Sequence, residues 1–358
     1  MMGQLLKTQV SLLITLLCLG SLLSTVIWFM VDSNYENIGK PVPQRKSAPK
    51  TYDFCKDCMG FIQQVLQEYP QTWKKQEDNF LKFKSNLSSK CHGQEKAFIT
   101  QVNNPVGTQI FYDQGRVKSL EVTPEIFKTF VKVQPFFNKT LDTCAVVGNG
   151  GILVDSGCGA DIDSAEFVIR CNLPPLNNSF HKHVGAKTSL VTANPSILRD
   201  RYGALMGHRR AFVEDMKMYS DSLLLLQAFY NSYYAFLSLR ASYTLEDFGS
   251  PIQPIFFNPE YRQNMADFWR SQGLEARRPS SGLLMVSLAL EICNNVHLYG
   301  FWPFSTHPFE LYSLTNHYYD DRKVNRNHIM PVEFQLLMQL HNNGVLKLHL
   351  GDCKPGKT

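Results

Sequence analysis

The feature that most limits the fold of this chain is an alternation of short apolar runs with amphipathic stretches from about residue 144 onward. The apolar runs predict strands at 144–147, 167–171, 190–193, 223–228, 255–258, 296–300 and 345–350. Helical spacing of apolar residues predicts helices at 195–206, 260–272, 281–294 and 331–342, and also within 55–85. Strands that alternate with helices predict an α/β fold, in which helices flank one mostly parallel sheet.

The composition supports one large folded body of low net charge. Hydrophobic residues make up 44% of the 358 residues, which excludes wholesale disorder. The chain carries 36 Lys and Arg against 31 Asp and Glu, a net charge of +5. Residues 1–52 hold +3 of this charge, so the remainder carries only +2. Nucleic-acid binding is therefore not expected, because it requires a concentrated basic surface.

Residues 8–31 contain no charged side chain and predict a transmembrane signal-anchor helix. Their helical length of roughly 36 Å is enough to span a bilayer. A cleaved signal peptide is the alternative, but the apolar run is longer than the ~7–15 residues of a signal h-region. Residues 1–7 then form a short cytoplasmic tail, the Pro-containing residues 32–52 a stem, and residues 53–358 the main body.

Three glycosylation sequons predict that the body is lumenal. Asn86, Asn138 and Asn177 each begin an Asn-x-Ser/Thr triplet, and all three follow the predicted span. Nine cysteines in one chain also favour an oxidising lumen. Type II topology is therefore expected. Cys55 and Cys58 form a C-x-x-C pair, but neither a preceding strand nor a second pair supports a redox or zinc site.

A glycine-rich turn follows the first predicted strand of the sheet. The segment 144–151 (CAVVGNGG) places backbone N–H groups where a phosphate binds in many α/β proteins. A dinucleotide site would need a third glycine at Leu153 and an acid after the next strand, where Asn172 stands. The turn therefore predicts a site for a different nucleotide at the carboxyl ends of the strands.

Four blocks of this sequence resemble the sialyl motifs of the animal sialyltransferases. Cys144–Pro175 (CAVVGNGGILVDSGCGADIDSAEFVIRCNLPP) resembles the long motif, and the blocks that begin at Arg278 (RPSSGLL) and end at Trp302 (VHLYGFW) resemble the short motif. His317–Asp320 (HYYD) and His328–Glu333 (HIMPVE) resemble the third and fourth motifs, in the same order. The segments GNGGIL and RCNLPP are similar to those of the α-2,8-sialyltransferase branch, of mono- or oligosialyl type.

The resemblance implies an inverting glycosyltransferase with a Rossmann-like sheet, a metal-independent variant of the GT-A fold. It would move sialic acid from CMP-sialic acid to the 8-hydroxyl of a terminal sialic acid on a glycoprotein or glycolipid glycan. Residues 53–358 would be the lumenal catalytic domain of a single-pass protein of the Golgi membrane. No cofactor and no metal are expected, and a homodimer is the candidate assembly.

The resemblance also implies roles for individual residues. His328 would be the general base, and His317 would face the CMP phosphate. The donor site would comprise Asn149, Asn172, Ser280, Ser281, Gly282, Trp302, Asn316 and His317. Asn316 replaces a histidine that is frequent in the branch, and Ser281 replaces a threonine, so we expect altered donor affinity with retained chemistry.

The resemblance implies two disulfides, Cys144–Cys293 and Cys158–Cys353. It leaves four cysteines without assigned partners: Cys55, Cys58, Cys91 and Cys171. Asp161 and Asp163 form a D-x-D pair, which many other glycosyltransferases use to hold a metal, but these acids fall at a predicted helix start. Metal dependence is therefore not expected.

Two alternative functions remain at this point: an α-2,3 or α-2,6 sialyltransferase that acts on galactose or N-acetylgalactosamine, and a sialoglycan-binding pseudoenzyme, suggested by Asn316. Residues 112–143 carry a net charge of only +1, which does not favour binding of a polysialic acid product. The sequence leaves open the acceptor class, the sialic acid transferred, the product chain length and the oligomeric state.

Overall fold

The computed structural model describes residues 14–25, 58–70, 72–113, 118–276, 278–322 and 328–353. The chain divides into two units, Met1–Val42 and Pro43–Thr358. In the first unit, residues 14–25 form a helix inside the predicted span 8–31, and the rest of that span lies outside the described residues. Among the residues that the structure describes, no helix is long and apolar enough to cross a membrane.

The second unit is built on an eight-stranded sheet in the order β1-β8-β7-β6-β5-β4-β9-β10. Every neighbouring pair is parallel except β1 and β8, which are antiparallel. The strands of this sheet are β1 (Phe98–Ile99), β4 (Leu141–Val147), β5 (Phe167–Arg170), β6 (Leu190–Ala193), β7 (Leu223–Leu226), β8 (Gln253–Phe257), β9 (Cys293–Tyr299) and β10 (Lys347–Leu348). A separate antiparallel pair comprises β2 (Gln109–Phe111) and β3 (Ser119–Glu121).

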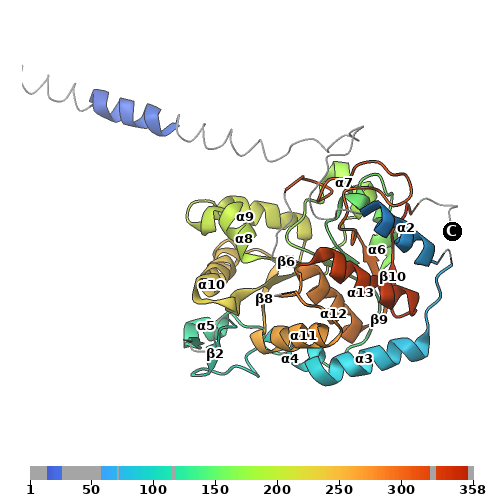
Figure 1. Cartoon of the computed structure of the whole chain (residues 1–358). Helices are drawn as coiled ribbons and strands as arrows, with labels where there is room; N and C mark the ends of the chain where they lie inside the picture. The colour runs from blue at the N-terminus through green and yellow to red at the C-terminus, as the bar shows by residue number, and fades with distance from the viewer. Residues whose placement is uncertain are drawn as a thin grey trace, which may run out of the picture. The chain divides into compact units, whose positions relative to one another are not determined.

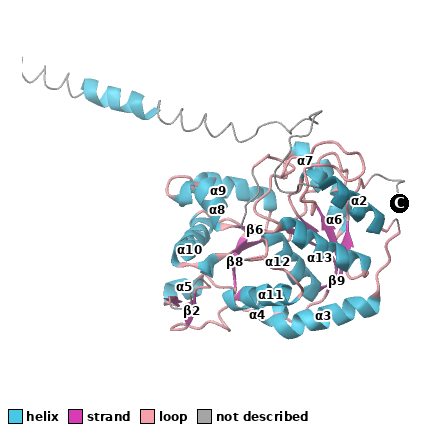
Figure 2. Cartoon of the chain, in the orientation of Figure 1, coloured by secondary structure: helices cyan, strands magenta, loops and turns pink. Residues whose placement is uncertain are grey.

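Helices cover both faces of the sheet (Figures 1 and 2). Right-handed crossovers place the helices between β4 and β8 on one face, and α11, α12 and α13 on the other. The helices are α2 (Cys58–Glu68), α3 (Glu77–Cys91), α4 (Gly93–Lys96), α5 (Pro124–Lys128), α6 (Gly159–Ser164), α7 (Asn178–Val184), α8 (Pro195–Asp200), α9 (Arg209–Met216), α10 (Ser232–Asp247), α11 (Pro259–Ser271), α12 (Ser281–Ile292) and α13 (Met330–Asn342). The chain leaves β4 for one face and enters β9 from the other, so the strand order reverses between these two strands.

The predicted α/β fold with a mostly parallel sheet is confirmed, and each predicted strand has a counterpart in the sheet. Buried parallel strands are apolar on both faces, so they stand out as apolar runs; β6, for example, is buried at all four positions. Several boundaries differ from the prediction: β4 and β9 begin three residues earlier, at Leu141 and Cys293, and β10 is confined to Lys347–Leu348. The strand predicted at 223–228 ends at Leu226, and the helix predicted at 195–206 ends at Asp200. Gly203, with φ +55°, follows in a separate 3-10 turn.

Both disulfides implied by the resemblance are present. Cys144–Cys293 joins β4 to the start of β9 with a Cα–Cα distance of 6.1 Å, and Cys158–Cys353 joins the start of α6 to the carboxyl-terminal segment at 4.7 Å. Cys91 and Cys171 are buried thiols without a disulfide partner, and burial raises the pKa of each to about 12. The side chains of Cys55 and Cys58 lie outside what the structure describes.

Candidate active site

The predicted glycine turn lies where the strand order reverses, which is the usual ligand site of a parallel α/β sheet. Gly150 donates its backbone N–H to the carbonyl of Gly300 at 3.0 Å, so the turns after β4 and β9 are joined. A Cβ atom at Gly148 or Gly150 would lie 2.7 or 2.6 Å from the carbonyl oxygen of Gly300. These glycines therefore permit the two turns to approach each other.

Asn149 and Asn172 follow β4 and β5 and lie side by side at the carboxyl edge. The Asn149 amide donates to the carbonyl oxygen of Cys171 at 2.8 Å, while its own side-chain oxygen is buried without a partner among the described residues. Asn172 adopts a left-handed conformation with φ 64°, and its side-chain oxygen accepts from the backbone N–H of Asn194 at 3.1 Å. The buried Asn149 oxygen is an acceptor available for a ligand hydroxyl or amine.

Asn194, Gln227 and Ser281 form a hydrogen-bonded triangle beside the asparagines. The Asn194 oxygen accepts from the Ser281 hydroxyl at 2.9 Å and from the Gln227 amide at 3.0 Å. The Gln227 amide also lies 3.0 Å from the Ser281 oxygen. This triangle ties the start of α12 to the ends of β6 and β7. The Ser281 hydroxyl proton is therefore engaged within the protein.

The amino terminus of α12 opens onto the same edge. Ser280 caps the helix: its hydroxyl accepts from the N–H of Leu283 at 3.1 Å. The backbone N–H of Ser280 donates to the buried carboxyl of Glu333 at 2.8 Å, and burial raises the pKa of Glu333 to about 7. The first N–H groups of α12, from Ser281 and Gly282, point along the helix axis and can bind an anion.

His328 lies just before α13, and its ring is held by the chain that leads into α12. Its Nδ1 is 3.2 Å from the carbonyl oxygen of Arg278. A carbonyl can only accept, so in this hydrogen bond Nδ1 carries the proton and Nε2 is left as a base. Burial lowers the pKa of His328, the carbonyl hydrogen bond opposes this, and the charge of Arg278 lowers the pKa further. A neutral imidazole with a bare Nε2 is the form that a general base requires.

His317 has the opposite electrostatic setting. Its Nδ1 lies 2.6 Å from a carboxylate oxygen of Asp320, and its ring stacks on Tyr319 at 5.2 Å. Burial alone would raise the pKa of Asp320, but hydrogen bonding to His317 and the charges of His317 and Arg322 leave it lowered. The Asp320 carboxylate therefore fixes the orientation of the His317 ring. Asn316 is adjacent, with its amide nitrogen 3.4 Å from His317 Nε2.

Trp302 is buried in an aromatic cluster next to the turn. Its side chain is only 3% exposed, its N–H donates to the carbonyl of Thr306 at 2.8 Å, and its ring packs against Phe304 and Phe334 at 4.8 and 5.2 Å. The role expected for Trp302, lining of the nucleotide pocket, stays a prediction. In this structure the side chain supports the loop that follows Gly300.

The carboxylates of the D-x-D pair serve the backbone or face solvent. Asp163 accepts from the N–H groups of Ala186 and Lys187, and Asp161 is exposed in the first turn of α6. Within the described residues there is no cluster of three or more His, Cys, Asp or Glu that could hold a metal ion. Metal independence stays a prediction.

The glycosylation acceptors and one cavity are separate from the carboxyl edge of the sheet. The predicted glycosylation acceptors Asn86, Asn138 and Asn177 are all exposed. A cavity of about 610 Å³ lies between α5, α9 and α10 and contains none of the residues predicted for the donor site.

The structure thus brings nearly all the predicted site residues to one edge of the sheet and adds others. Asn194 could have been predicted as a site residue, because it directly follows a predicted strand, as Asn172 does. Gln227 was hidden inside the strand predicted at 223–228. For Arg278, the sequence offers no indication of a role beyond its position at the start of the short motif.

Comparisons with known proteins identify the family of the chain. Residues 94–345 match the family model described as glycosyltransferase family 29 (sialyltransferase). The human alpha-2,8-sialyltransferase 8E is 43% identical over 272 residues, which cover 76% of this chain and 72% of the relative. The alpha-N-acetylneuraminide alpha-2,8-sialyltransferase of Bos taurus is 40% identical over 294 residues, 82% of each chain.

A solved mammalian sialyltransferase aligns with 85% of this chain and all of its own, at 20% identity and a TM-score of 0.42. The family assignment rests on the sequence comparisons, which confirm the predicted resemblance to sialyltransferases and find relatives that bear α-2,8 names. The chain belongs to glycosyltransferase family 29, the sialyltransferases.

Proposed function

We propose that the chain is an inverting α-2,8-sialyltransferase that transfers sialic acid from CMP-sialic acid to the 8-hydroxyl of a terminal sialic acid on a glycan. The observation that carries this proposal is the meeting of His328, His317 and the amino terminus of α12 at one edge of the sheet, in a family 29 member whose relatives are named α-2,8-sialyltransferases.

The donor needs groups that bind a nucleotide and stabilise a departing phosphate. Asn149 and Asn172 would hold the nucleoside, and the unpartnered Asn149 oxygen supports a hydrogen bond to it. The N–H groups of Ser281 and Gly282 can receive the phosphate oxygens. The His317 ring, oriented by Asp320, would donate a hydrogen bond to the phosphate as it leaves.

The acceptor needs a base. His328 is held with Nδ1 as donor to the Arg278 carbonyl, so Nε2 can take the proton of the attacking hydroxyl. One displacement with one base gives inversion, and no covalent nucleophile is required. The bond from the anomeric carbon to the phosphate oxygen breaks as the bond to the acceptor oxygen forms.

The proposal includes a single-pass type II protein of the Golgi membrane, anchored by residues 8–31. Two disulfides and three exposed sequons in the body support a lumenal location. The alternative is an enzyme that forms α-2,3 or α-2,6 bonds to asialo acceptors, and the experiment must distinguish it from an α-2,8-sialyltransferase.

The test is transfer by the purified full chain, in detergent, with CMP-sialic acid and matched sialylated and asialo acceptors, with and without EDTA. We expect one added sialic acid on the sialylated acceptor only, with a rate unchanged by EDTA. Transfer to the asialo acceptor would support the α-2,3 or α-2,6 reaction instead. CMP binding without transfer to either acceptor would indicate a pseudoenzyme, and inhibition by EDTA would contradict metal independence.

A further inference from the structure

The residue Arg278 is tied to the predicted base but has no role in the motif-based assignment. Its backbone carbonyl accepts the hydrogen bond from His328, and it precedes the cap residue of α12 by two positions. The segment that orients His328 therefore also carries the Arg278 side chain. The positive charge of Arg278 also contributes to the lowered pKa of His328.

The Arg278 guanidinium rests on an aromatic surface. Its Cζ lies 5.3 Å from the ring centroid of Tyr230, and Tyr230 in turn stacks on Tyr234 at 5.8 Å. Tyr230 ends the 3-10 turn that follows β7, so this surface belongs to the carboxyl edge of the sheet. A cation–π contact restricts the orientation of a guanidinium and leaves its N–H fork available for a ligand.

The positive charge at this place exceeds the negative charge. Arg262 approaches the same Tyr230 ring, at 5.0 Å, and is paired with Asp113. Arg278 has no carboxylate partner among the described residues. A half-buried guanidinium without a counter-ion, beside a catalytic base, suits an anionic substrate group, and an Arg fork binds a carboxylate with two parallel hydrogen bonds.

The position favours the acceptor over the donor as the source of that anion. The turn that carries Gly148 and Asn149 follows β4 and packs against the turn after β9, whereas Tyr230 follows β7, beyond β5 and β6 in the strand order. The donor phosphate already has the amino terminus of α12 and the His317 ring. If the acceptor is a sialic acid, as the proposed function states, the same sugar carries both the attacking 8-hydroxyl and a carboxylate.

We propose that Arg278, held on Tyr230, binds the carboxylate of the acceptor's terminal sialic acid and so selects sialylated over neutral acceptors. This inference rests on the proposed function. The Arg278 guanidinium anchors the sugar while His328 Nε2 takes the proton from its 8-hydroxyl. A site built around this ion pair rejects an asialo acceptor, because the guanidinium would be left without a partner.

The test combines a protein variant with a modified acceptor. Kinetics of the full chain are measured with Arg278, Arg278→Lys and Arg278→Gln, each against a sialylated acceptor and the same acceptor with its terminal carboxylate converted to a methyl ester. Arg270→Gln is the matched control, since Arg270 is an exposed arginine of α11 paired with Asp267. CMP affinity is measured for every variant.

We expect Arg278→Gln to raise the KM for the sialylated acceptor by about 10- to 100-fold, with Arg278→Lys intermediate and Arg270→Gln unchanged. Esterification of the acceptor should raise the acceptor KM of the wild-type protein by a similar factor. It should leave the KM of Arg278→Gln unchanged, because the two changes remove the same contact. The affinity for CMP should be the same in all variants.

Three results would overturn the inference. An unchanged acceptor KM in Arg278→Gln, or equal sensitivity of this variant and the wild-type protein to esterification, would remove Arg278 from acceptor binding. A loss of CMP affinity would place the residue in the donor site. Each of these leaves the proposed function intact if the wild-type protein sialylates sialylated acceptors; a wild-type protein that uses only asialo acceptors would overturn both proposals.

Discussion

The two ends of α12 each lie against a buried carboxyl group, and the two groups differ in how they are hydrogen-bonded. At the amino end, Glu333 accepts from the N–H of Ser280. At the carboxyl end, Glu291 accepts from the Tyr261 hydroxyl at 2.5 Å and from the N–H of Gly93 at 2.7 Å, through its two different oxygens. Burial raises the pKa of both carboxyl groups. The amino end lies at the candidate site, and the carboxyl end lies where the sheet begins.

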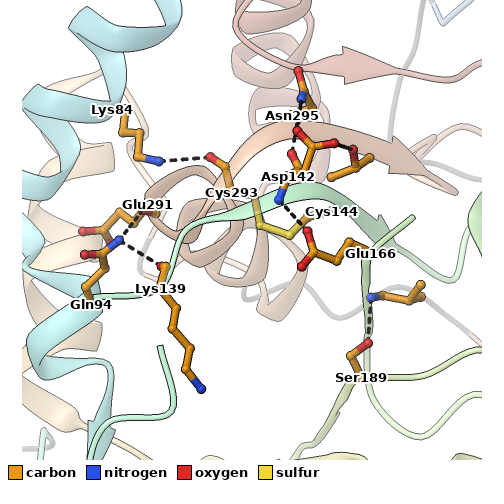
Figure 3. The surroundings of a disulfide bond; sticks show 12 residues. Lys84, Gln94, Lys139, Asp142, Cys144, Glu166, Ser189, Glu291, Cys293 and Asn295 are labelled. Carbon is orange, nitrogen blue, oxygen red and sulfur yellow. Dashed lines mark hydrogen bonds between the residues drawn. A yellow bond between two sulfur atoms is a disulfide. The ribbon is translucent and has the colours of Figure 1, made fainter. Parts of the chain in front are cut away.

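The same contrast extends across the two edges of the sheet. At the starting edge, Lys84 donates to the Cys293 carbonyl, and the Asp142 N–H donates to Glu166 (Figure 3). At the carboxyl edge, the Asn149 oxygen lacks a partner, and Asn172 adopts a left-handed conformation. The buried Asn149 oxygen can be satisfied by a ligand, whereas the contacts of Lys84 and Asp142 stabilise the fold. Substitutions at the two edges should therefore affect different measurements.

The largest expected effect belongs to the carboxyl edge. His328→Ala should slow transfer by about 10²- to 10⁴-fold, because it removes the base that takes the acceptor proton. The free energy of unfolding should change by less than about 1 kcal/mol, since the half-buried ring makes one side-chain hydrogen bond to a carbonyl. Initial rates and urea unfolding are measured together. The control is His181→Ala, whose ring is 60% exposed on α7. A near wild-type rate in folded His328→Ala would contradict the role of His328.

The next effect belongs to the starting edge. Replacement of both Cys144 and Cys293 by Ala should lower the free energy of unfolding by about 2–5 kcal/mol, because the disulfide closes a loop of 149 residues. The rate per folded molecule should stay within twofold at 25 °C, since the disulfide lies ahead of the Gly148 turn. Urea midpoints and rates normalised to the folded fraction provide the measurement. A variant that stays stable but turns over slowly would show that the two edges are not separable.

Much of the fold and of the site follows from the chain's local pattern. Parallel strands buried on both faces produce apolar runs such as Leu223–Leu226, so the sheet can be predicted without long-range information. The two-residue strand β1 cannot, because it is defined only by its pairing with β8. For the same reason the separate strands β2 and β3 are absent from the prediction.

The site divides in the same way. Asn149, Asn172 and Ser280 directly follow or precede predicted elements, and their place at one edge follows from strand direction alone. The partner of the Trp302 N–H and the stacking of Arg278 on Tyr230 depend on loops that meet only in the tertiary structure. Such contacts join segments that are distant in the sequence, so no local pattern predicts them.

The two buried carboxyl groups at the ends of α12 should affect stability in different ways. The pKa of Glu333 is about 7 in the folded chain and about 4.3 in an unfolded one, so the folded chain binds more protons between these values. The wild-type protein should therefore lose up to about 3 kcal/mol of stability as pH rises from 4.5 to 7. Glu333→Gln keeps an oxygen for the Ser280 N–H and has no proton to lose, so this loss should largely disappear.

Glu291→Gln separates the two ends of α12. An amide has one acceptor oxygen, whereas Glu291 accepts through both of its oxygens, so this variant should be destabilised at every pH. Urea midpoints at pH 5 and pH 7 compare the three proteins. If Glu333→Gln kept the wild-type pH dependence, Glu333 would not be the group that titrates.

The smallest expected effect compares two helix caps. Ser280 caps α12 and Asn258 caps α11, where its side-chain oxygen accepts from the N–H of Glu260 at 2.9 Å. Replacement of either cap by Ala should cost about 1 kcal/mol of stability. Only Ser280→Ala should also weaken CMP binding, because a frayed first turn of α12 no longer directs its N–H groups at the phosphate, whereas α11 contributes no N–H group to the proposed phosphate site. Calorimetric titration with CMP measures this difference. An equal CMP affinity in the two variants would show that the nucleotide does not use the amino terminus of α12, and the contrast between the helix ends would then concern stability alone.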